Sequence, residues 1–288
     1  MRNKLDVTEQ KALEVRAHRL ASELLERLGL MRAPVDPLAV AEAEAPILKV
    51  RSGNFKRLFD GRLEYHPKQN LFLLFYNTKY ESSYPGRTRF SIGHELAHYF
   101  LPEHRSYLLG GGEAHSSRTE FQSVATSIER EADAFSAGLL LPRKLIYPRV
   151  GSQELSPEFL ADMADDFKTS LIATSMRAVQ VSPFPSAAMM LRKGKVVWRQ
   201  VSDPLISAGW YPRKGLHSIQ AQNQWKSMVA GAPVAPSAEV KLTDWFDAYG
   251  ETTEESTIAT EYYMPMPRIE TLLVVVCADE DDLFSIYD

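Results

Sequence analysis

The sequence predicts an α+β protein, because stretches with helical spacing of apolar residues and stretches with strand-like composition occupy separate blocks of the chain. Helical stretches dominate the first 180 residues around one short strand-rich segment, and strand-like runs return after residue 183. The 288 residues are 44% apolar and 24% charged, which is ordinary for a globular protein of one large domain or two smaller ones.

The N-terminal part is predicted to combine two helices with a small sheet. Apolar side chains recur at helical spacing over residues 7–30, and a short second helix is predicted over 38–45 after two prolines. Residues 47–50 are a strand candidate, and 62–65 can pair with 70–76 as a hairpin. We expect the strand at 70–76 to offer an edge to which an extended peptide adds.

Three further helical stretches are predicted in the middle of the chain. Thr88 is a candidate N-cap for a helix that Pro102 ends. A long helix is predicted from about Phe121 to Leu141 and stops at the following proline. Residues 154–180 also have helical spacing of apolar side chains.

The C-terminal part is predicted to be richer in strands. Residues 182–185, with two prolines, are the expected domain boundary. A hairpin is predicted over 187–201, a long loop over 231–236, and strands over 260–264 and 271–278.

Composition excludes several classes of protein. A net charge of −4 disfavours binding to nucleic-acid phosphates through overall charge, so we expect no direct DNA binding. The single cysteine, Cys277, excludes an internal disulfide and a sulfur-rich metal site. The N-terminus lacks the apolar run of a secretion signal, and no apolar stretch is long enough to span a bilayer, so we expect a cytoplasmic protein without membrane attachment.

The segment His94-Glu95-Leu96-Ala97-His98 carries the strongest functional signal. Residues four apart on a helix are offset by only about 40°, so both imidazoles can converge on one ion. Glu95 lies roughly 100° from His94, where its carboxylate can reach a water at the metal. Two neutral nitrogen ligands beside a general base is the arrangement of a metallohydrolase.

A third protein ligand is expected downstream, since two imidazoles leave an ion under-coordinated. Glu129 and Asp133 share one face of the long predicted helix, so Glu129 can bind the ion while Asp133 accepts a hydrogen bond from a ligand imidazole. Glu131 points to another side and is the less favoured alternative for the third ligand, since its expected place is a solvated face of the helix.

The segment from Arg89 to Leu101 and the segment from Glu129 to Pro142 together resemble the ImmA/IrrE metallo-endopeptidases. The resemblance runs from about residue 10 to 180 and includes the turn at Pro34–Pro37. It implies that His94, His98 and Glu129 bind the metal and that Glu95 is the catalytic residue. Many members have Asn where this chain has Asp133, and either side chain can accept a hydrogen bond.

The resemblance also implies an architecture. A zincin-like peptidase core at residues 1–150, consisting of a small sheet, an active-site helix and a second ligand helix, is followed by a helix-turn-helix-like segment at 151–182. A smaller α+β domain at 183–288, with a sensory or substrate-selecting role, completes the expected chain.

The implied activity is cleavage of a protein substrate, a helix-turn-helix transcriptional repressor, which de-represses stress-response or mobile-element genes. Zinc is the expected ion, although two imidazoles and a carboxylate also suit manganese. The oligomeric state is left open by the sequence. The alternatives are a non-cleaving regulatory or antitoxin-like protein built on a peptidase fold, and a DNA-binding regulator, which the acidic first helix of 155–180 disfavours.

Three other polar side chains lie close to the motif or between the two ligand segments. His115 in a loop and Tyr99 could each donate to a developing oxyanion or contact the substrate, although a loop histidine is more often only solvated. His104 follows the motif closely, and we expect it at a helix end or on the surface.

Overall fold

The computed structural model describes residues 7–117, 126–215, 218–249, 257–279 and 283. The chain divides into two units, which are described separately: residues 1–145 with 164–170, and residues 146–163 with 171–288. The first division lies close to the expected boundary at residue 150. The helical segment at 151–182 is shared between the units rather than standing alone, and no division falls at 182–185.

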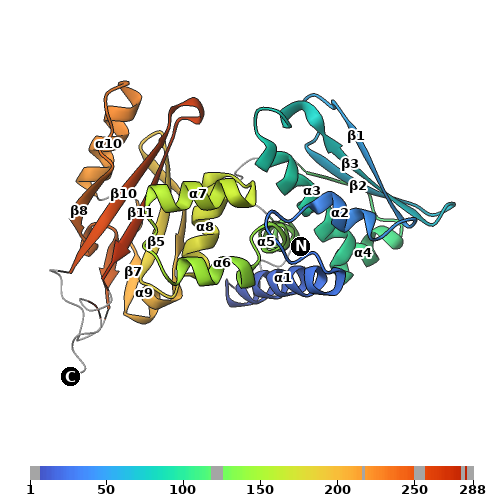
Figure 1. Cartoon of the computed structure of the whole chain (residues 1–288), viewed down its shortest axis with the longest axis horizontal. Helices are drawn as coiled ribbons and strands as arrows, with labels where there is room; N and C mark the ends of the chain where they lie inside the picture. The colour runs from blue at the N-terminus through green and yellow to red at the C-terminus, as the bar shows by residue number, and fades with distance from the viewer. Residues whose placement is uncertain (1–6, 118–125, 216–217, 250–256, 280–282, 284–288) are drawn as a thin grey trace. The chain divides into compact units, whose positions relative to one another are not determined.

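The first unit contains a four-stranded sheet with helices packed on it (Figure 1). Its strands are β1 (Leu48–Gly53), β2 (Gly61–His66), β3 (Leu71–Asn77) and β4 (His115–Ser117), in the order β1-β3-β2-β4. The predicted hairpin of β2 and β3 is confirmed. The prediction that β3 offers an edge is wrong, because β3 pairs with β1 on one side and with β2 on the other. The edges of this sheet are β1 and β4.

Helix α3 (Pro85–Phe100) lies on the sheet and is buried along most of its length. Leu63, Phe72 and Leu74 from the strands are buried in the same apolar core as Leu96 of the helix. Thr88 is not the N-cap, because the helix already begins at Pro85. Proline at the first helical position has the right φ and needs no N–H partner there.

The other helices of the first unit complete its core. Helix α1 (Val7–Leu28) and helix α5 (Ser127–Leu140) pack together, and α5 also packs against α3. Thr126 caps α5 by accepting a hydrogen bond from the Glu129 backbone at 3.4 Å. The part of the predicted helix at 121–125 lies outside the described residues. Two shorter helices and a turn complete the described part of the unit: α2 (Pro37–Glu42), α4 (Pro102–Leu109) and the 3-10 turn η1 (Thr78–Tyr80).

The second unit is built on a five-stranded antiparallel sheet in the order β6-β5-β11-β10-β8. These strands are β5 (Ser186–Arg192), β6 (Lys195–Val201), β8 (Ser237–Lys241), β10 (Ile258–Met266) and β11 (Thr271–Ala278). The predicted hairpin at 187–201 and the predicted strands at 260–264 and 271–278 are confirmed.

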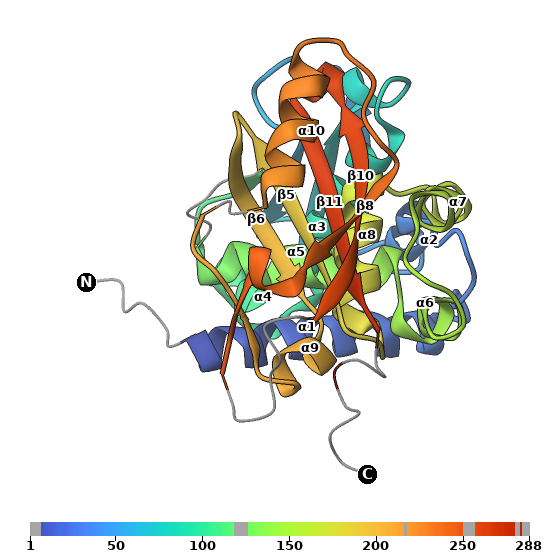
Figure 2. The same cartoon turned by 90° about the vertical axis from the view of Figure 1, so that its left-hand side faces the viewer.

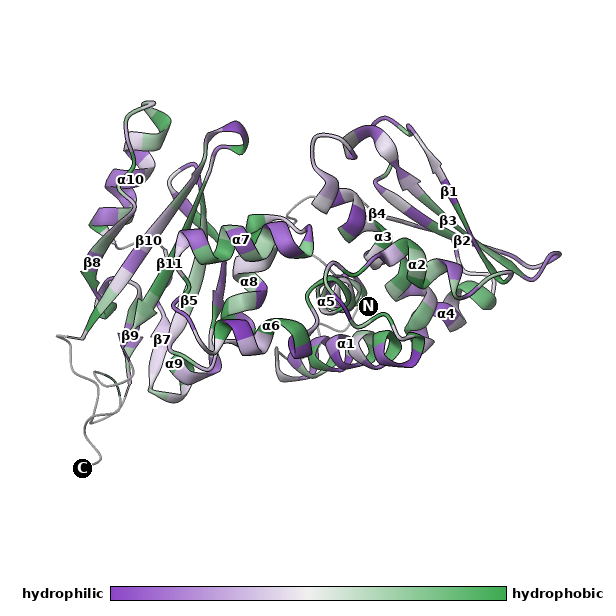
Figure 3. Ribbon diagram, viewed as in Figure 1, coloured by the Kyte–Doolittle hydropathy of each residue, from purple (hydrophilic) through white to green (hydrophobic). Residues whose placement is uncertain are grey.

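Helices cover both faces of this sheet, with α10 (Ile219–Val229) in front and α8 (Leu171–Val181) behind in Figure 2. The central strand β11 is therefore apolar on both sides, as its green colour in Figure 3 shows, and its residues from Leu272 to Val276 are fully buried. The other elements are α6 (Arg143–Val150), α7 (Pro157–Phe167), α9 (Asp203–Ser207), β7 (Trp210–Pro212), β9 (Phe246–Ala248) and the 3-10 turns η2 (Leu242–Asp244) and η3 (Pro267–Ile269).

The α+β prediction is confirmed, and the arrangement is consistent with a zincin-like domain followed by a β-rich domain. Among the helices that the structure describes, none combines the length and the apolar character needed to cross a bilayer.

Candidate metal centre

Helices α3 and α5 approach each other closely because the residues at their contact are small. Ser136 of α5 is fully buried and donates a hydrogen bond from Oγ to the Phe90 carbonyl of α3 at 2.9 Å. A Cβ added to Gly93 would lie 2.5 Å from Ser136 Oγ. The two helices can therefore bring their polar side chains to one place.

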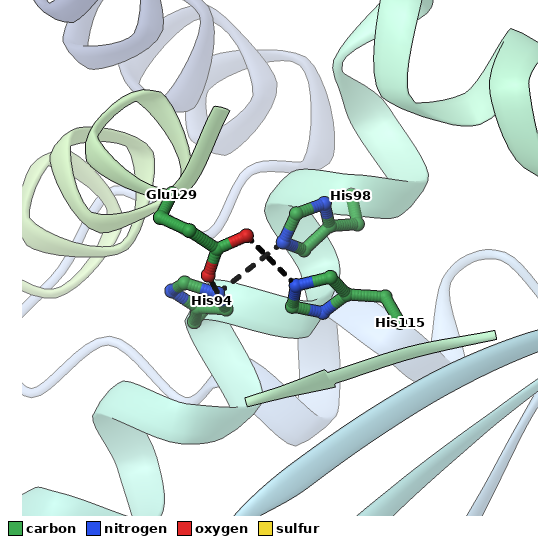
Figure 4. Close-up of side chains that lie close together, drawn as sticks. All are labelled: His94, His98, His115 and Glu129. Carbon is green, nitrogen blue, oxygen red and sulfur yellow. Dashed lines mark hydrogen bonds and ion pairs between the residues drawn. The ribbon is translucent and has the colours of Figure 1, made fainter. Parts of the chain in front are cut away.

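Four of these side chains form a cluster, which Figure 4 shows: His94, His98, His115 and Glu129. One nitrogen or oxygen atom from each lies within 4.8 Å of the atoms from all the others. His94 Nε2 is 3.2 Å from His98 Nε2 and 3.3 Å from Glu129 Oε2. The two histidines of α3 are 5% and 3% exposed, whereas the side chains of His115 and Glu129 are 19% and 32% exposed, so the cluster is buried on the α3 side and partly exposed on the other.

The structure thus brings the three expected ligands together and places Glu129 rather than Glu131 beside the imidazoles. Glu131 lies 3.3 Å from His104 Nε2, through its Oε2 atom. The expectation that Glu131 is solvated is wrong, because this residue is 5% exposed. His104 was expected at a helix end or on the surface, and it lies in the first turn of α4 but is only 6% exposed, so the surface alternative is wrong.

Asp133 occupies the position expected for a hydrogen-bond partner of a ligand imidazole. Its Oδ1 atom is 2.8 Å from His94 Nδ1, the ring nitrogen that faces away from the cluster. A carboxylate on this nitrogen fixes the proton there and leaves the Nε2 lone pair of a neutral His94 ring facing the cluster.

His115 is the cluster member that the sequence did not identify as a metal ligand. It lies in strand β4 rather than in a loop, and its ring stacks on His98 at a centroid distance of 3.6 Å. Its Nδ1 is 3.1 Å from Glu95 Oε2, and its Nε2 is 2.9 Å from Glu129 Oε1. Its place depends on the pairing of β4 with β2, for which the local sequence contains no signal.

Glu95 is fully buried, and both of its carboxylate oxygens have partners. Ser117 Oγ donates to Oε1 at 2.5 Å, and His115 lies on Oε2. Strand β2 leaves room for this carboxylate at Gly61, where a Cβ would lie 2.7 Å from Glu95 Cγ. His115 and Ser117 of β4 therefore hold Glu95 at the edge of the cluster, and Gly61 of β2 leaves the space that its carboxylate occupies.

Tyr99 is not brought to the cluster. Its hydroxyl donates to Glu44 Oε2 at 2.9 Å, and its ring packs edge-on against Phe72 in the core. The side chain is fully buried, so the suggestion that Tyr99 contacts a substrate or an oxyanion finds no geometric basis.

In the absence of a metal, the cluster contains two protonated imidazoles, His94 and His115, which are hydrogen-bonded to carboxylates. Burial lowers the pKa of His94, but the hydrogen bonds with Asp133 and Glu129 outweigh it and raise the pKa to about 10. Burial likewise opposes the charged form of His115, whose contacts with Glu129 and Glu95 raise its pKa to about 9. Despite its burial, the pKa of Glu129 lies far below its usual value because of the same imidazoles.

His98 behaves differently from the other two imidazoles. Burial and the neighbouring imidazoles keep the pKa of His98 well below its usual value, so this ring is neutral. A neutral imidazole offers a lone pair, which is the form that binds a metal.

This donor set fits a divalent ion. Imidazole nitrogens and a carboxylate oxygen are the ligands that zinc accepts without sulfur, and manganese also accepts them. The cluster contains a neutral ring, an imidazole oriented by an outer carboxylate, and an ionised carboxylate within 4.8 Å of one another. Without a metal, protons on His94 and His115 balance the negative charge of the neighbouring carboxylates. A bound dication would take the place of these protons.

Comparisons with known proteins found a similar fold and a matching family model. Among solved structures, the chain is similar to a transcriptional regulator from Mycobacterium tuberculosis, with a TM-score of 0.53 and 14% identity, over 95% of this chain and 79% of that chain. At this identity the likeness concerns the fold. No curated protein sequence matches the chain. The family model of the IrrE N-terminal-like domain, Peptidase_M78, matches residues 73–178, which include the whole cluster. In these residues the chain is therefore similar to the IrrE N-terminal-like domain of the Peptidase_M78 family.

Proposed function

We propose that this chain is a zinc-dependent endopeptidase that hydrolyses a peptide bond in a protein substrate. The observation that carries the proposal is the cluster in which His94, His98 and Glu129 meet beside the carboxylate of Glu95. The match of residues 73–178 to a peptidase family supports it.

In this proposal His94, His98 and Glu129 hold the ion and Glu95 is the general base. A bound zinc ion supplies Lewis-acid polarisation of a carbonyl and lowers the pKa of water. Glu95 accepts a proton from the attacking water at Oε2 and passes it to the nitrogen of the leaving amine. Asp133 keeps the proton of His94 on Nδ1.

His115 is proposed to act on the same carboxylate and on the developing oxyanion. Its Nδ1 contacts Glu95 and its Nε2 contacts Glu129, so the ring lies between the base and the metal ligands. A protonated ring at this place can donate to negative charge that develops at the substrate carbonyl.

The substrate is proposed to be a helix-turn-helix transcriptional repressor, whose loss de-represses stress-response or mobile-element genes. This part of the proposal rests on the resemblance of the segments at 89–101 and 129–142 to the ImmA/IrrE peptidases. Residues 183–288 are proposed to select the substrate or to sense a signal, and the site of action is proposed to be the cytoplasm.

One observation favours the second candidate, a regulatory or antitoxin-like protein that binds its partner without cutting it. Four protein groups, rather than three, surround the place for an ion, and structural zinc sites are closed by four ligands. If His115 is a fourth ligand, no position remains for water.

The test begins with purified protein and elemental analysis, in which about one ion per chain is expected for the wild type. The metal-loaded protein is then incubated with candidate helix-turn-helix repressors from the same genome, and the products are separated by size. Glu95→Gln should keep the ion and yield no fragments, because an amide cannot accept the proton.

Glu103→Gln is the matched control, since Glu103 is an exposed glutamate of the next helix that pairs with Arg16. It should cleave like the wild type. Cleavage by Glu95→Gln at the wild-type rate would exclude Glu95 as the base. Metal-loaded wild type that binds the repressor and leaves it intact would support the non-cleaving candidate.

A further inference from the structure

The inference concerns the second nitrogen of His98, which faces away from the cluster into the core. His98 Nδ1 lies 3.0 Å from Nδ1 of His104, a residue of α4. His104 Nε2 in turn lies 3.3 Å from Glu131 Oε2 on α5. All three side chains are less than 7% exposed, so the His98–His104–Glu131 relay is buried from end to end.

When Nε2 of His98 is the atom that binds an ion, one placement of protons along the relay follows from the contacts. Nε2 of His98 faces the other ligand atoms, so the proton of the neutral ring belongs on Nδ1. That proton is donated to Nδ1 of His104, which must therefore be an acceptor. The proton of His104 then sits on Nε2 and is donated to Glu131.

Burial of Glu131 at this place is energetically unfavourable. Among the buried atoms of the described residues, its Oε1 has no hydrogen-bond partner, and burying a carboxylate with one satisfied oxygen costs free energy. An apolar side chain would fill the same space at lower cost. The other oxygen, Oε2, contacts Nε2 of His104. We infer that the function of the Glu131 carboxylate is to orient the His104 ring.

The two imidazoles of α3 thus have different outer partners. Asp133 contacts His94 directly and is half-exposed. Glu131 reaches His98 only through His104 and is shielded from solvent. In both cases a carboxylate determines which ring nitrogen carries the proton.

We propose that His104 and Glu131 are positioning residues that hold His98 in the tautomer and orientation that present Nε2 to a divalent ion. This inference rests on the metal centre of the proposed function and adds two residues to it. Loss of an outer partner of this kind typically weakens metal binding by about 10–100-fold.

The experiment measures the affinity of the full-length protein for Zn²⁺ by competition with a chromophoric chelator, and the visible spectrum of the Co²⁺ form. His104→Leu and Glu131→Leu should each bind Zn²⁺ about 10–100-fold more weakly and change the Co²⁺ spectrum. His104→Asn should recover much of the loss, because the Asn Oδ1 can accept the His98 proton that Leu cannot. His66→Leu, at a half-exposed histidine of β2, is the matched control and should bind like the wild type.

NMR of the wild-type protein tests the relay without relying on variants, which could fail to fold. In the ¹⁵N-labelled zinc form, long-range nitrogen–proton spectra should show His98 protonated on Nδ1 and His104 protonated on Nε2. His98 protonated on Nε2, or His104 protonated on Nδ1, would overturn the relay.

The outcomes separate this inference from the proposed function. A wild type that binds no Zn²⁺ would overturn the metal centre itself. A wild type that binds Zn²⁺ while folded His104→Leu and Glu131→Leu match it in affinity and Co²⁺ spectrum would leave the metal centre intact and overturn the relay.

Discussion

Replacing Gly93 with alanine tests whether the close approach of α3 and α5 is what assembles the metal centre. The new Cβ would lie 2.5 Å from Ser136 Oγ and 3.4 Å from Ser136 Cα, far inside normal contact for the first atom. Ser136 must rotate, which breaks its hydrogen bond to Phe90, and the helices must also move apart, because Ser136 Cβ would still lie 3.3 Å from the new methyl group. This movement would lengthen the 3.3 Å distance between His94 and Glu129.

The expected loss in the free energy of unfolding is the balance of three contributions. Overpacking costs about 1–3 kcal/mol and the lost hydrogen bond about 1 kcal/mol, while alanine is about 1 kcal/mol more favourable than glycine within a helix. The net loss of about 2 kcal/mol should lower Tm by roughly 4–8 °C for a unit of this size. Because both ligand helices are involved, Zn²⁺ affinity should also fall by about tenfold.

The assay pairs thermal unfolding of the metal-free protein with Zn²⁺ competition. Gly93→Ala/Ser136→Ala should recover part of both losses, since it removes the oxygen that meets the new methyl group. Gly110→Ala is the control, because its Cβ would meet no atom nearer than 3.3 Å and α4 supplies no cluster residue. A Gly93→Ala protein with wild-type Tm and wild-type Zn²⁺ affinity would refute the reasoning.

Three other predictions concern the cluster itself. Glu129→Ala should reduce the bound ion from about one per chain to near zero in elemental analysis after dialysis, and an unchanged content would remove Glu129 as a ligand. His115→Ala should keep the ion but slow cleavage; loss of the ion with it would instead identify a fourth ligand and favour the non-cleaving protein. Because the pKa of His94 is about 10 without metal, its Nε2 proton must leave when an ion binds at neutral pH, so affinity should rise about tenfold per pH unit between 7 and 9. Calorimetry in buffers with different ionisation enthalpies would detect the released proton, and an affinity independent of pH would contradict this assignment.

Elements with strong local signals were predictable from the sequence. The β2–β3 and β5–β6 hairpins have apolar runs on both sides of short polar turns, and both occur in the structure. Helix α10 was missed although Ala221, Trp225 and Met228 recur at helical spacing and pack in the core of the second unit, because polar residues make up most of the stretch. The start of α3 was misplaced because Pro85, rather than a polar cap, begins the helix.

The same distinction applies to the cluster. His94, His98 and the choice of Glu129 over Glu131 follow from positions around a helix, which the sequence encodes locally. His115 joins them only because β4 pairs with β2, and His104 meets His98 only because α4 folds back beside α3. Contacts between separate elements depend on the tertiary fold, and a single sequence contains no period that reveals them.

The bare backbone at Gly61 has a consequence for how this chain tolerates change. The carboxylate of Glu95 occupies the volume that any larger residue at position 61 would need, although the two belong to different elements. In a saturation screen scored by activity, every substitution at position 61 should therefore abolish activity, as substitutions of His94, Glu95 and His98 should. Gly61 itself has no side chain that takes part in the chemistry.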